Sequence, residues 1–353
     1  MKPFAERLLA WFDVHGRHDL PWQHPRDPYR VWVSEVMLQQ TQVRTVIAYF
    51  EQFVSELPDI ESLAVASEDR VFGLWSGLGY YSRARNLRRA AQTVIAEHGG
   101  KLPTDIEALQ TLPGIGPSTA AAILAQANGQ RHAILDGNVK RVLARHRGID
   151  GWPGGSKVQA ALWNEAERFT PHDRIADYTQ AIMDLGATIC IRSRPRCSEC
   201  PVAADCVARL ENRTTELPQR KPRRAIPARA TTMLLLRDAD GRVLLQKRPP
   251  TGVWSGLWSL PEFADRVAAD KALQDYGATY SKELDAFTHT FSHFRLEIAP
   301  LLADVVVPFR AVADAPDLEW YGSEQWSVLG LPAPVRRLLQ SLDTQQTGTR
   351  DVP

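Results

Sequence analysis

One glutamate stands among apolar residues and could act as a proton donor. Glu35 lies in the run VWVSEVMLQQTQV, whose apolar residues recur at the three-to-four spacing of an amphipathic helix. Its apolar neighbours in this run include Val33, Val36, Met37 and Leu38. If this helix faces inward, the loss of water raises the pKa of the Glu35 carboxyl group, and the neutral acid can donate a proton. The run by itself also allows a surface position for Glu35.

The second acidic candidate stands at the start of another helical run. The stretch LDGNVKRVLAR, residues 135–145, begins an amphipathic pattern directly after Asp136. Aspartate is favoured as a helix cap, because its side chain accepts the free N–H groups of the first turn. A carboxylate in the same place could also stabilise positive charge on a substrate. This stretch alone favours the cap.

All four cysteines of the chain lie close together in the sequence. Cys190, Cys197, Cys200 and Cys206 are separated by six, two and five residues. Cysteines that staple a secreted fold are usually scattered, so this clustering indicates a metal site. Four thiolates can bind either a tetrahedral zinc ion or an iron–sulfur cluster, and the spacing does not decide between them.

The stretch LPGIGPSTAAAIL, residues 112–124, has the pattern of a helix–hairpin–helix motif. Gly114 and Gly116 would let the backbone turn tightly and approach a ligand closely. The amides of the turn and the start of the following helix can bind a DNA phosphate without reading bases. The alternative is an ordinary helical hairpin.

The elements that would hold these residues fall into two regions of different composition. The first 210 residues or so alternate helical patterns with Gly- and Pro-rich breaks. After them, NRTTELPQRKPRRAIPARA is rich in Pro and Arg and predicts an exposed linker. Two apolar runs around DADG then predict a β-hairpin, and APVRRLLQSL predicts a helix. We expect a helical region over 1–211, a linker over 212–228, a mixed domain over 229–343 and a disordered tail over 344–353.

The charge of the chain permits nucleic-acid binding without requiring it. The first 226 residues carry 29 Lys and Arg against 25 Asp and Glu, and the remainder carries 13 against 16. The amphipathic N-terminus contains Glu6 and Asp13 and lacks the apolar core of a signal peptide. No uncharged run approaches the about 18 residues that span a bilayer. We therefore expect no membrane contact and a cytoplasmic protein.

Five motifs occur in one order and together resemble a family of DNA repair enzymes. They are SEVMLQQTQV, GLGYYSRARNL, LPGIGPSTA, LDGNVKRVLAR and the cysteine loop. The set resembles the MutY-type adenine glycosylases of the endonuclease III superfamily. The resemblance implies an all-α helix–hairpin–helix DNA glycosylase with a [4Fe–4S] loop, followed by an α+β Nudix-like domain. It also implies base-excision repair in a bacterial cell, at the nucleoid, on double-stranded DNA with adenine mispaired to 8-oxoguanine or guanine.

The resemblance assigns roles to four residues of the helical region. Glu35 corresponds to the acid that protonates the adenine, and Asp136 to the carboxylate that stabilises the sugar cation. Asn138 would hold these groups in place, and Ser118 matches a family position near the reacting sugar. In this family the hairpin precedes the catalytic aspartate by about twenty residues, as Gly116 precedes Asp136 here.

The resemblance also bears on the cofactor and on the type of reaction. It favours one [4Fe–4S] cluster, held by the four cysteines, over zinc. The sibling glycosylases with lyase activity have a catalytic lysine where this chain has Ser118, and they read VDTH where this chain reads LDGN. Without that amine, no group stands at the expected place to form a Schiff base. We therefore expect hydrolysis alone, with a glycosylase/lyase as the alternative.

Several residues match family positions that contact DNA. Gln40, Thr41, Leu78 and Tyr80 match residues that wedge into the duplex and help to offset the cost of base flipping. For Leu78 and Tyr80, core packing is an equally good interpretation. The expected phosphate contacts are Gly114, Gly116, Lys140 and Arg141.

The second region resembles a Nudix domain that has lost its own chemistry. A Nudix pyrophosphatase needs a glutamate-rich R-E-x-x-E-E helix to bind metal, and no such cluster follows VWSGLWSLPEF. The segment FTHTFSHFRLEI resembles the family loop that contacts 8-oxoguanine. Ser292 and His293 are the candidates, together with Phe291, and His289 is a weaker one. A structural role is the alternative for His293.

These features leave one competing function of a different class. A non-catalytic protein that binds lesions and uses the cluster as a redox reporter would need the same motifs for DNA but no working carboxylates. In either case we expect a monomer.

Overall fold

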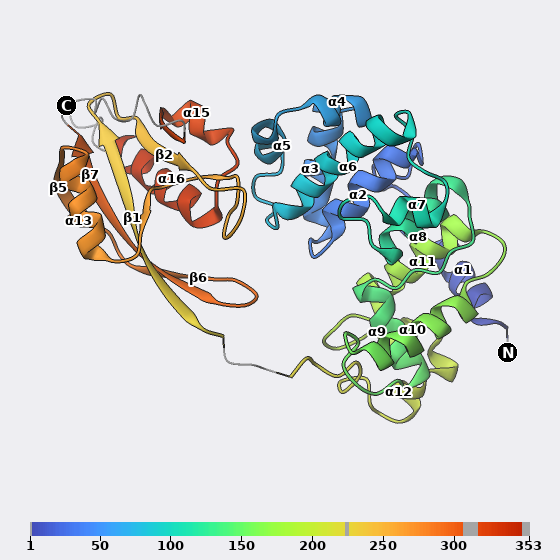
Figure 1. Cartoon of the computed structure of the whole chain (residues 1–353). Coiled ribbons are helices and arrows are strands. Elements are labelled where there is room, and N and C mark those ends of the chain that lie inside the picture. Colours follow the sequence, from blue (N-terminus) through green and yellow to red (C-terminus); the bar gives the residue numbers. More distant parts are fainter. Residues whose placement is uncertain (1, 223–225, 306–316, 348–353) are drawn as a thin grey trace. The chain divides into compact units, whose positions relative to one another are not determined.

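The computed structural model divides the chain into two units by its contacts. It describes residues 2–222, 226–305 and 317–347. One unit comprises Met1–Ala66 and Ser82–Arg223, and the other comprises Ser67–Tyr81 and Arg224–Pro353. Figure 1 shows the course of the chain. Residues 67–81, placed in the helical region by their sequence, therefore group with the second unit.

The first unit is built from helices. Its α-helices are α1 (Phe4–His15), α2 (Pro28–Leu38), α3 (Val43–Glu56), α4 (Ile60–Val65), α6 (Ser82–His98), α7 (Ile106–Gln110), α8 (Pro117–Asn128), α9 (Gly137–Arg147), α10 (Ser156–Phe169), α11 (Ile175–Asp184) and α12 (Val207–Leu210). A π-helical turn, η1 (Leu185–Ile189), continues α11, and the cysteine loop contains the 3₁₀ turns η2 (Cys197–Glu199) and η3 (Ala203–Asp205). Apart from the run that contains Glu35, these bounds agree with the helical patterns of the sequence.

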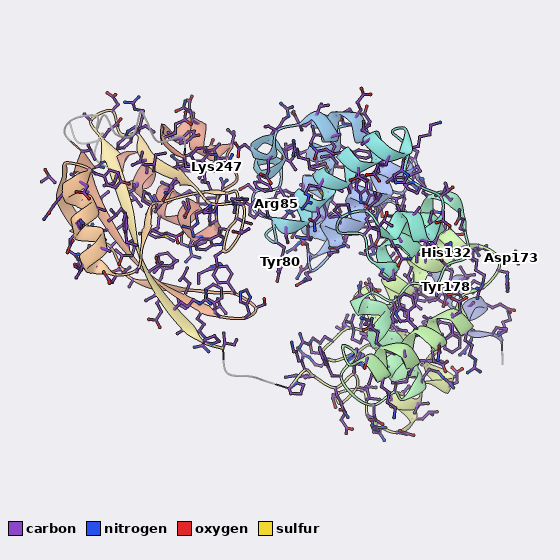
Figure 2. The ribbon with its side chains drawn as sticks, viewed as in Figure 1. Tyr80, Arg85, His132, Asp173, Tyr178 and Lys247 are labelled. Atoms are coloured by element: carbon purple, nitrogen blue, oxygen red, sulfur yellow. The ribbon has the colours of Figure 1, made fainter. Side chains whose placement is uncertain are left out.

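One apolar core joins the N-terminal helix to the later helices of this unit. Leu8 and Phe12 of α1 pack with residues of α8, α9, α10 and α11, including Leu143 and Tyr178. Tyr178 lies in the interior of this group (Figure 2). On its other side α8 contacts α2, which also packs against α3 and α6. Helix α8 therefore lies between the two halves of the unit. Its side chains can contact residues of both halves.

Local sequence signals set the ends of the helices at the site. The side chain of Asp27 accepts from Arg30 N and caps α2, which begins with Pro28. Helices α8 and α9 end at Gly129 and Gly148, which take the left-handed conformation with φ of 67° and 64°. The helix that carries Glu35 and the helix that follows Asp136 are thus fixed at their starts by caps.

The predicted helical run over residues 29–43 is interrupted. Helix α2 ends at Leu38, and α3 begins at Val43. The buried guanidinium of Arg83 donates to the carbonyl oxygens of Met37 and Gln39 at 2.8 and 2.6 Å, and Gln40 takes a left-handed φ of 61°. Because Arg83 satisfies carbonyl groups that further helix would have used, the chain turns here.

The second unit is an α+β domain around a mixed sheet. Within the described residues the sheet has the central order β3-β2-β1-β7-β5, with β4 on β1, β6 on β7 and β8 on β2. Its strands are β1 (Ala228–Asp238), β2 (Val243–Lys247), β3 (Trp258–Ser259), β4 (Glu262–Phe263), β5 (Ala278–Glu283), β6 (Phe287–Thr290), β7 (Arg295–Val305) and β8 (Leu318–Tyr321). Its helices are α5 (Glu68–Leu74), α13 (Arg266–Asp275), α15 (Ser323–Ser327) and α16 (Ala333–Thr347). The β1–β7 pair is parallel and the other pairs are antiparallel.

Helices cover both faces of this sheet. Leu273 of α13 packs on one face, and Val335 and Leu339 of α16 pack on the other (Figure 1). Leu301, Leu302 and Ala303 of β7 are buried in succession, as expected of a strand covered on both faces. The α+β architecture confirms the predicted fold class.

Residues 67–81 attach to this unit by polar contacts. Lys247 of β2, labelled in Figure 2, donates from Nζ to Asp69 Oδ2 at 2.6 Å. Tyr81 donates its hydroxyl to the carbonyl oxygen of Leu331 at 3.1 Å. The segment that carries the wedge candidates is therefore held by the domain that carries the lesion-reading candidates.

The predicted linker and tail are partly ordered. Within 212–228, Leu217 is buried and its carbonyl oxygen accepts from Arg145 Nε at 2.8 Å. Helix α16 continues to Thr347, four residues into the predicted disordered tail, and residues 348–353 lie outside the described part of the chain. No helix within the described ranges has the length and apolar character that crossing a membrane requires.

Candidate active site

Glu35 is a partly buried acid held by one amide. Its side chain leaves α2 between the fully buried residues Trp32 and Met37. Gln126 of α8 donates from Nε2 to Glu35 Oε1 at 2.8 Å. Burial, and after it the charge of Asp136, raise the pKa of the Glu35 carboxyl to about 7. The group can therefore be protonated near neutral pH, as the apolar neighbours in the sequence predict.

Asp136 is indeed a helix cap. Its Oδ1 accepts from Val139 N at 2.7 Å at the start of α9. Burial raises the pKa of this carboxyl, and hydrogen bonds from the backbone of Val139 and Asn138 act against that rise. The ionised form is thus expensive to bury but is hydrogen-bonded in place. The cap does not exclude chemistry, since one carboxylate oxygen suffices for the cap.

The two carboxyl groups belong to one site. The negative charge of Asp136 is close enough to raise the pKa of Glu35. Two neighbouring carboxyl groups resist being ionised together, so their titrations separate. Glu35 is the more easily protonated partner because an ionised Asp136 keeps the caps of α9 in place. The structure therefore places a carboxyl group that favours its neutral form near one whose anion accepts backbone hydrogen bonds.

Ser118 links the hairpin helix to the residue before Asp136. Its Oγ accepts from Leu135 N at 2.9 Å. Gly114 has a left-handed φ of 82°, and a Cβ there would approach the Cβ of Asn86 to 2.8 Å, so the turn requires glycine. Gly116 has φ of −92° and open space around it. The tight turn therefore depends on Gly114, and Gly116 leaves the start of α8 accessible.

Arg141 is committed to the interior of the site. Its Nη2 donates to Asn138 Oδ1 at 2.7 Å and to Gly186 O at 2.6 Å, and its Nε donates to Cys190 O at 2.7 Å. These bonds hold Nε and Nη2 of the guanidinium inward and disfavour the expected phosphate contact of Arg141, which stays a prediction. The neighbouring Lys140 is partly exposed, so its phosphate contact stays a prediction.

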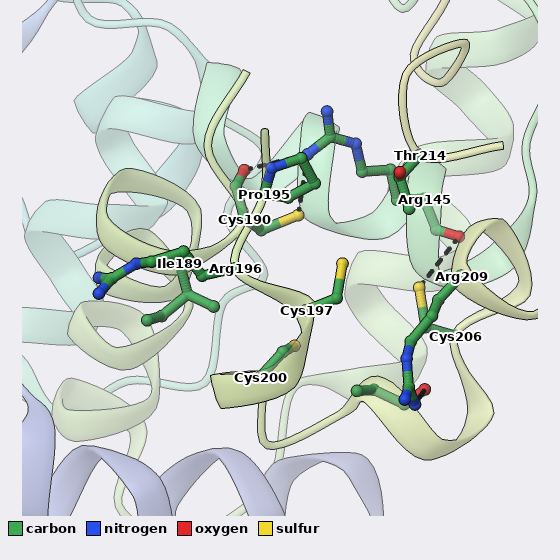
Figure 3. A pocket seen from close by; sticks show the side chains of 11 residues that line it. Arg145, Ile189, Cys190, Pro195, Arg196, Cys197, Cys200, Cys206, Arg209 and Thr214 are labelled. Carbon is green, nitrogen blue, oxygen red and sulfur yellow. Dashed lines mark hydrogen bonds between the residues drawn. The ribbon is translucent and has the colours of Figure 1, made fainter. Parts of the chain in front are cut away.

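The four cysteines surround one cavity. Figure 3 shows the side chains of Cys190, Cys197, Cys200 and Cys206 around this cavity. Buried Arg145 donates to Cys190 Sγ at 3.4 Å and to the carbonyl oxygen of Ile191 at 2.7 Å. In the described part of the chain, no three Cys, His, Asp or Glu side chains are close enough to share one metal ion.

Two polar side chains with direct contacts at this site escaped the sequence patterns. They are Gln126, which bonds Glu35, and Arg83, which shapes the turn at Gln40 and Thr41. Arg83 Nη2 donates to Thr41 Oγ1 at 3.2 Å. A charged or amide residue within an otherwise apolar helical face is the signal that could have identified both. Gln40 is exposed and Thr41 partly buried.

The wedge candidates of the second unit differ in exposure. Tyr80 is 53% exposed and takes a left-handed φ of 49° (Figure 2). Leu78 is 6% exposed. A wedge role for Leu78 would thus require the segment to rearrange on DNA, whereas Tyr80 already presents its ring.

The lesion-reading candidates form the tip of the hairpin between β6 and β7. Phe291 N donates to Phe294 O at 2.9 Å and closes the turn, which leaves Ser292 and His293 exposed. The rings of Phe291 and buried Phe294 stack with centroids 4.4 Å apart. The tip therefore presents a hydroxyl and an imidazole on a rigid aromatic base. His289 packs edge-on against Phe291, which favours a supporting role.

The fold and site define a class of protein. Residues 33–168 match the HhH-GPD superfamily base excision DNA repair proteins, and residues 232–341 match the NUDIX domain. The solved structure of a thermostable thymine-DNA glycosylase covers 59% of this chain and 95% of its own, with 28% identity and a TM-score of 0.52. A non-covalent endonuclease III–DNA complex, 19% identical with a TM-score of 0.51, shows the same fold over 59% of this chain and 94% of its own.

Full-length relatives narrow this class. The adenine DNA glycosylase of Buchnera aphidicola subsp. Acyrthosiphon pisum is 35% identical over 96% of this chain and 97% of its own length. That of Homo sapiens is 35% identical over 98% of this chain and 75% of its own. The chain belongs to the adenine DNA glycosylase family, which confirms the predicted family and class of enzyme.

The raised pKa of Glu35 predicts a pH-dependent cost in stability. The folded protein holds this proton more tightly than the unfolded chain, so the free energy of unfolding falls as the pH rises from about 4.5 to about 7. Glu35→Gln abolishes this loss. The difference in free energy of unfolding between variant and parent should change by about 2–3 kcal/mol in favour of the variant from pH 5 to pH 8. Urea unfolding at the two pH values measures it. Exposed Glu97→Gln should show no such gain. An equal difference at both pH values would contradict the assignment.

Proposed function

We propose that this member of the adenine DNA glycosylase family removes adenine opposite 8-oxoguanine or guanine, by hydrolysis alone. The observation that carries the proposal is the pair of Glu35, with a pKa raised to about 7, and Asp136 at the start of α9. Adenine is a poor leaving group, so its departure needs a proton on the base and a negative charge near the sugar. The pair supplies both.

In the first step the flipped adenine is protonated and leaves. Glu35 donates its proton to N7 of the adenine, which is worth about 10²–10⁴-fold for general acid catalysis. The bond between the sugar C1′ and the base N9 then breaks, and its electron pair goes to the base. The positive charge that develops on the sugar faces the Asp136 carboxylate, which stabilises it in a site with little water.

In the second step water completes the hydrolysis. The Glu35 carboxylate, now ionised, takes a proton from water as the oxygen bonds to C1′, and both groups return to their starting states. Ser118 fixes Leu135 and thereby the position of Asp136, and Asn138 is held by Arg141 beside it. No lysine lies in α8, so no residue of this helix offers an amine for a lyase reaction.

DNA binding is proposed for surfaces of both units. The open start of α8 at Gly114 and Gly116 would bind a backbone phosphate, with Lys140 beside a second one. Gln40, Thr41 and Tyr80 would enter the space that the flipped nucleotide leaves, and Leu78 would join them after a rearrangement. A monomeric protein at the bacterial nucleoid remains our expectation.

We propose one [4Fe–4S] cluster at the four cysteines. Each iron atom of such a cluster takes one thiolate, so its four sulfur ligands surround a space rather than meet at one ion. Cys190, Cys197, Cys200 and Cys206 all line one cavity, which supports the proposal. When bound, the cluster would brace the loop against α9, whose Arg141 and Arg145 hold its first cysteine.

The cluster predicts the colour of the purified protein. The parent should be yellow-brown, with broad absorbance near about 400 nm from iron–thiolate charge transfer and four iron atoms per chain. Cys197→Ser should lose most of this absorbance, because it removes one ligand, and Ser198→Ala in the same loop should keep it. Colourless parent protein with one zinc per chain would contradict the proposal.

The 8-oxoguanine preference is proposed to reside in the hairpin tip. This base differs from guanine by an oxygen at C8 and a hydrogen at N7. A serine hydroxyl can both donate and accept, so Ser292 can bond either new group, and His293 adds a second polar contact. The stacked Phe291 and Phe294 keep the tip in position.

The tip variants test this preference. Ser292→Ala and His293→Ala should each lower the ratio of the adenine-removal rates opposite 8-oxoguanine and opposite guanine by about tenfold, the equivalent of about 1.4 kcal/mol for one lost polar contact. Single-turnover kinetics on the two duplexes measures the ratio. Thr288→Ala, exposed on β6 of the same hairpin, should leave it unchanged. An unchanged ratio in both tip variants would place the recognition elsewhere.

The catalytic pair is tested on a labelled duplex with adenine opposite 8-oxoguanine. The parent should give a strand break at the adenine only after alkali, since hydrolysis leaves an intact sugar–phosphate backbone. Glu35→Gln and Asp136→Asn should each slow the reaction at least about 10²-fold while the duplex is still bound. Exposed Asp173→Asn serves as the control. Parent-like rates in Glu35→Gln would remove the acid from the mechanism, and a break without alkali would establish a lyase.

A further inference from the structure

One buried amide at the site has no role in the mechanism so far. Helix α8 is buried on all sides from Ala120 to Gln126. Gln126 is the one polar residue in that stretch and is 5% exposed, whereas the other members are Ala, Ile and Leu. A primary amide has two donors and an acceptor, and burying it without partners costs roughly 1–3 kcal/mol. An apolar residue would fill this position more cheaply, so the amide calls for an explanation.

The partner of the amide is the proposed acid. Gln126 Nε2 donates to Glu35 Oε1 at 2.8 Å, across 91 positions of sequence. The two side chains come from α8 and α2, which pack directly against each other. The donor therefore reaches Glu35 from the hairpin helix, the same helix that fixes Leu135 through Ser118.

The geometry of this bond distinguishes the two oxygens of the acid. An N–H group bonded to Oε1 disfavours a proton on that oxygen, because the two hydrogens would compete for the same space. The acidic proton is then carried by Oε2, the oxygen that the amide leaves open. A carboxyl group with a fixed proton position is a better general acid than one that rotates, since reaction requires the proton to point at its acceptor.

We propose that Gln126 is a positioning residue, which directs the acidic proton of Glu35 to Oε2 and stabilises the carboxylate after transfer. The proposal rests on the proposed role of Glu35 as the acid. An amide donor bonds an ionised oxygen more strongly than a neutral one, so Gln126 also favours release of the proton.

Few charged groups act on Glu35, so a change in its titration on loss of Gln126 can be attributed to the lost hydrogen bond. Asp136 is the one ionisable group in the described residues that acts on its carboxyl, and it raises the pKa, while the bond from Gln126 lowers it. Helix α8 contains no ionisable residue. In α6, Arg83 is bonded to carbonyl groups of α2. The charged residues of α3, which are Arg44, Glu51 and Glu56, are exposed.

The test is the pH dependence of adenine removal. Single-turnover rates of the full-length, cluster-loaded protein are measured from pH 5 to pH 9 on a duplex with adenine opposite guanine, which makes the result independent of the 8-oxoguanine preference. The variants are Gln126→Leu, the similarly shaped Gln126→Met, Glu35→Gln and Gln130→Leu. Gln130 donates to the carbonyl oxygen of Thr104 at 3.0 Å and is a matched loss of an amide away from Glu35.

Removal of the amide should change the pH profile as well as the rate. The rate of the parent falls at alkaline pH as Glu35 loses its proton. Without the stabilising donor this fall should move to higher pH by about one unit, and the maximal rate should decrease by about tenfold. Gln130→Leu should superimpose on the parent.

The outcomes separate this proposal from the one on which it rests. An alkaline fall at the parent pH in both Gln126 variants, with Glu35→Gln inactive, would overturn the role of Gln126 alone. A lower rate with an unchanged profile counts as this outcome, since packing damage does not move a titration. Activity in Glu35→Gln would overturn the role of Glu35 itself. If Gln126→Leu fails to bind the duplex, Gln126→Met decides.

Discussion

The candidate site depends on the burial of two neighbouring carboxyl groups in a place with little water. Glu35 and Asp136 cannot both be ionised there without cost, and their surroundings decide which one keeps a proton. Asp136 receives backbone hydrogen bonds at the start of α9, which favour its anion, whereas Glu35 receives a single amide bond. These surroundings favour the neutral acid at Glu35 and the anion at Asp136 at the same pH. Burial of the ionised Glu35 carboxyl lowers the stability of the fold. Glu35→Gln is therefore expected to raise the free energy of unfolding at neutral and alkaline pH.

The rest of the helical unit acts as support for that pair. Helix α8 bonds the Glu35 carboxyl through Gln126, and through Ser118 it bonds the backbone of Leu135, the residue before Asp136. Helix α9 extends from Asp136 to the cysteine loop, where Arg141 and Arg145 bond the backbone and sulfur of Cys190. Hydrogen bonds of Arg141 therefore connect the cysteine loop to Asn138, two residues after Asp136. The proposed cluster would thus serve to hold α9 in place.

Local sequence patterns predict many residues of this candidate site. They do not predict the contacts that depend on long-range packing. The apolar neighbours of Glu35, the cap signal at Asp136 and the cysteine spacing each depend on a few adjacent residues. The bond between Gln126 and Glu35 joins residues 91 positions apart, so only the packing of α2 on α8 reveals it. The same dependence on long-range packing explains two differences between the sequence predictions and the structure. Arg141 reads as a solvated cation until its three internal bonds are seen, and residues 67–81 read as helical scaffold until Lys247 is found bonded to Asp69.

The division of protonation between the two carboxyl groups is open to direct observation. The side-chain carboxyl carbons of glutamate can be labelled with ¹³C, and the Glu35 signal can be assigned by its absence in Glu35→Gln. Titration by NMR should then show this signal changing with a midpoint near pH 7, well above the ordinary value of 4.5. A midpoint near 4.5 would mean that Glu35 is ionised at neutral pH, and the account of an acid paired with an anion would be contradicted.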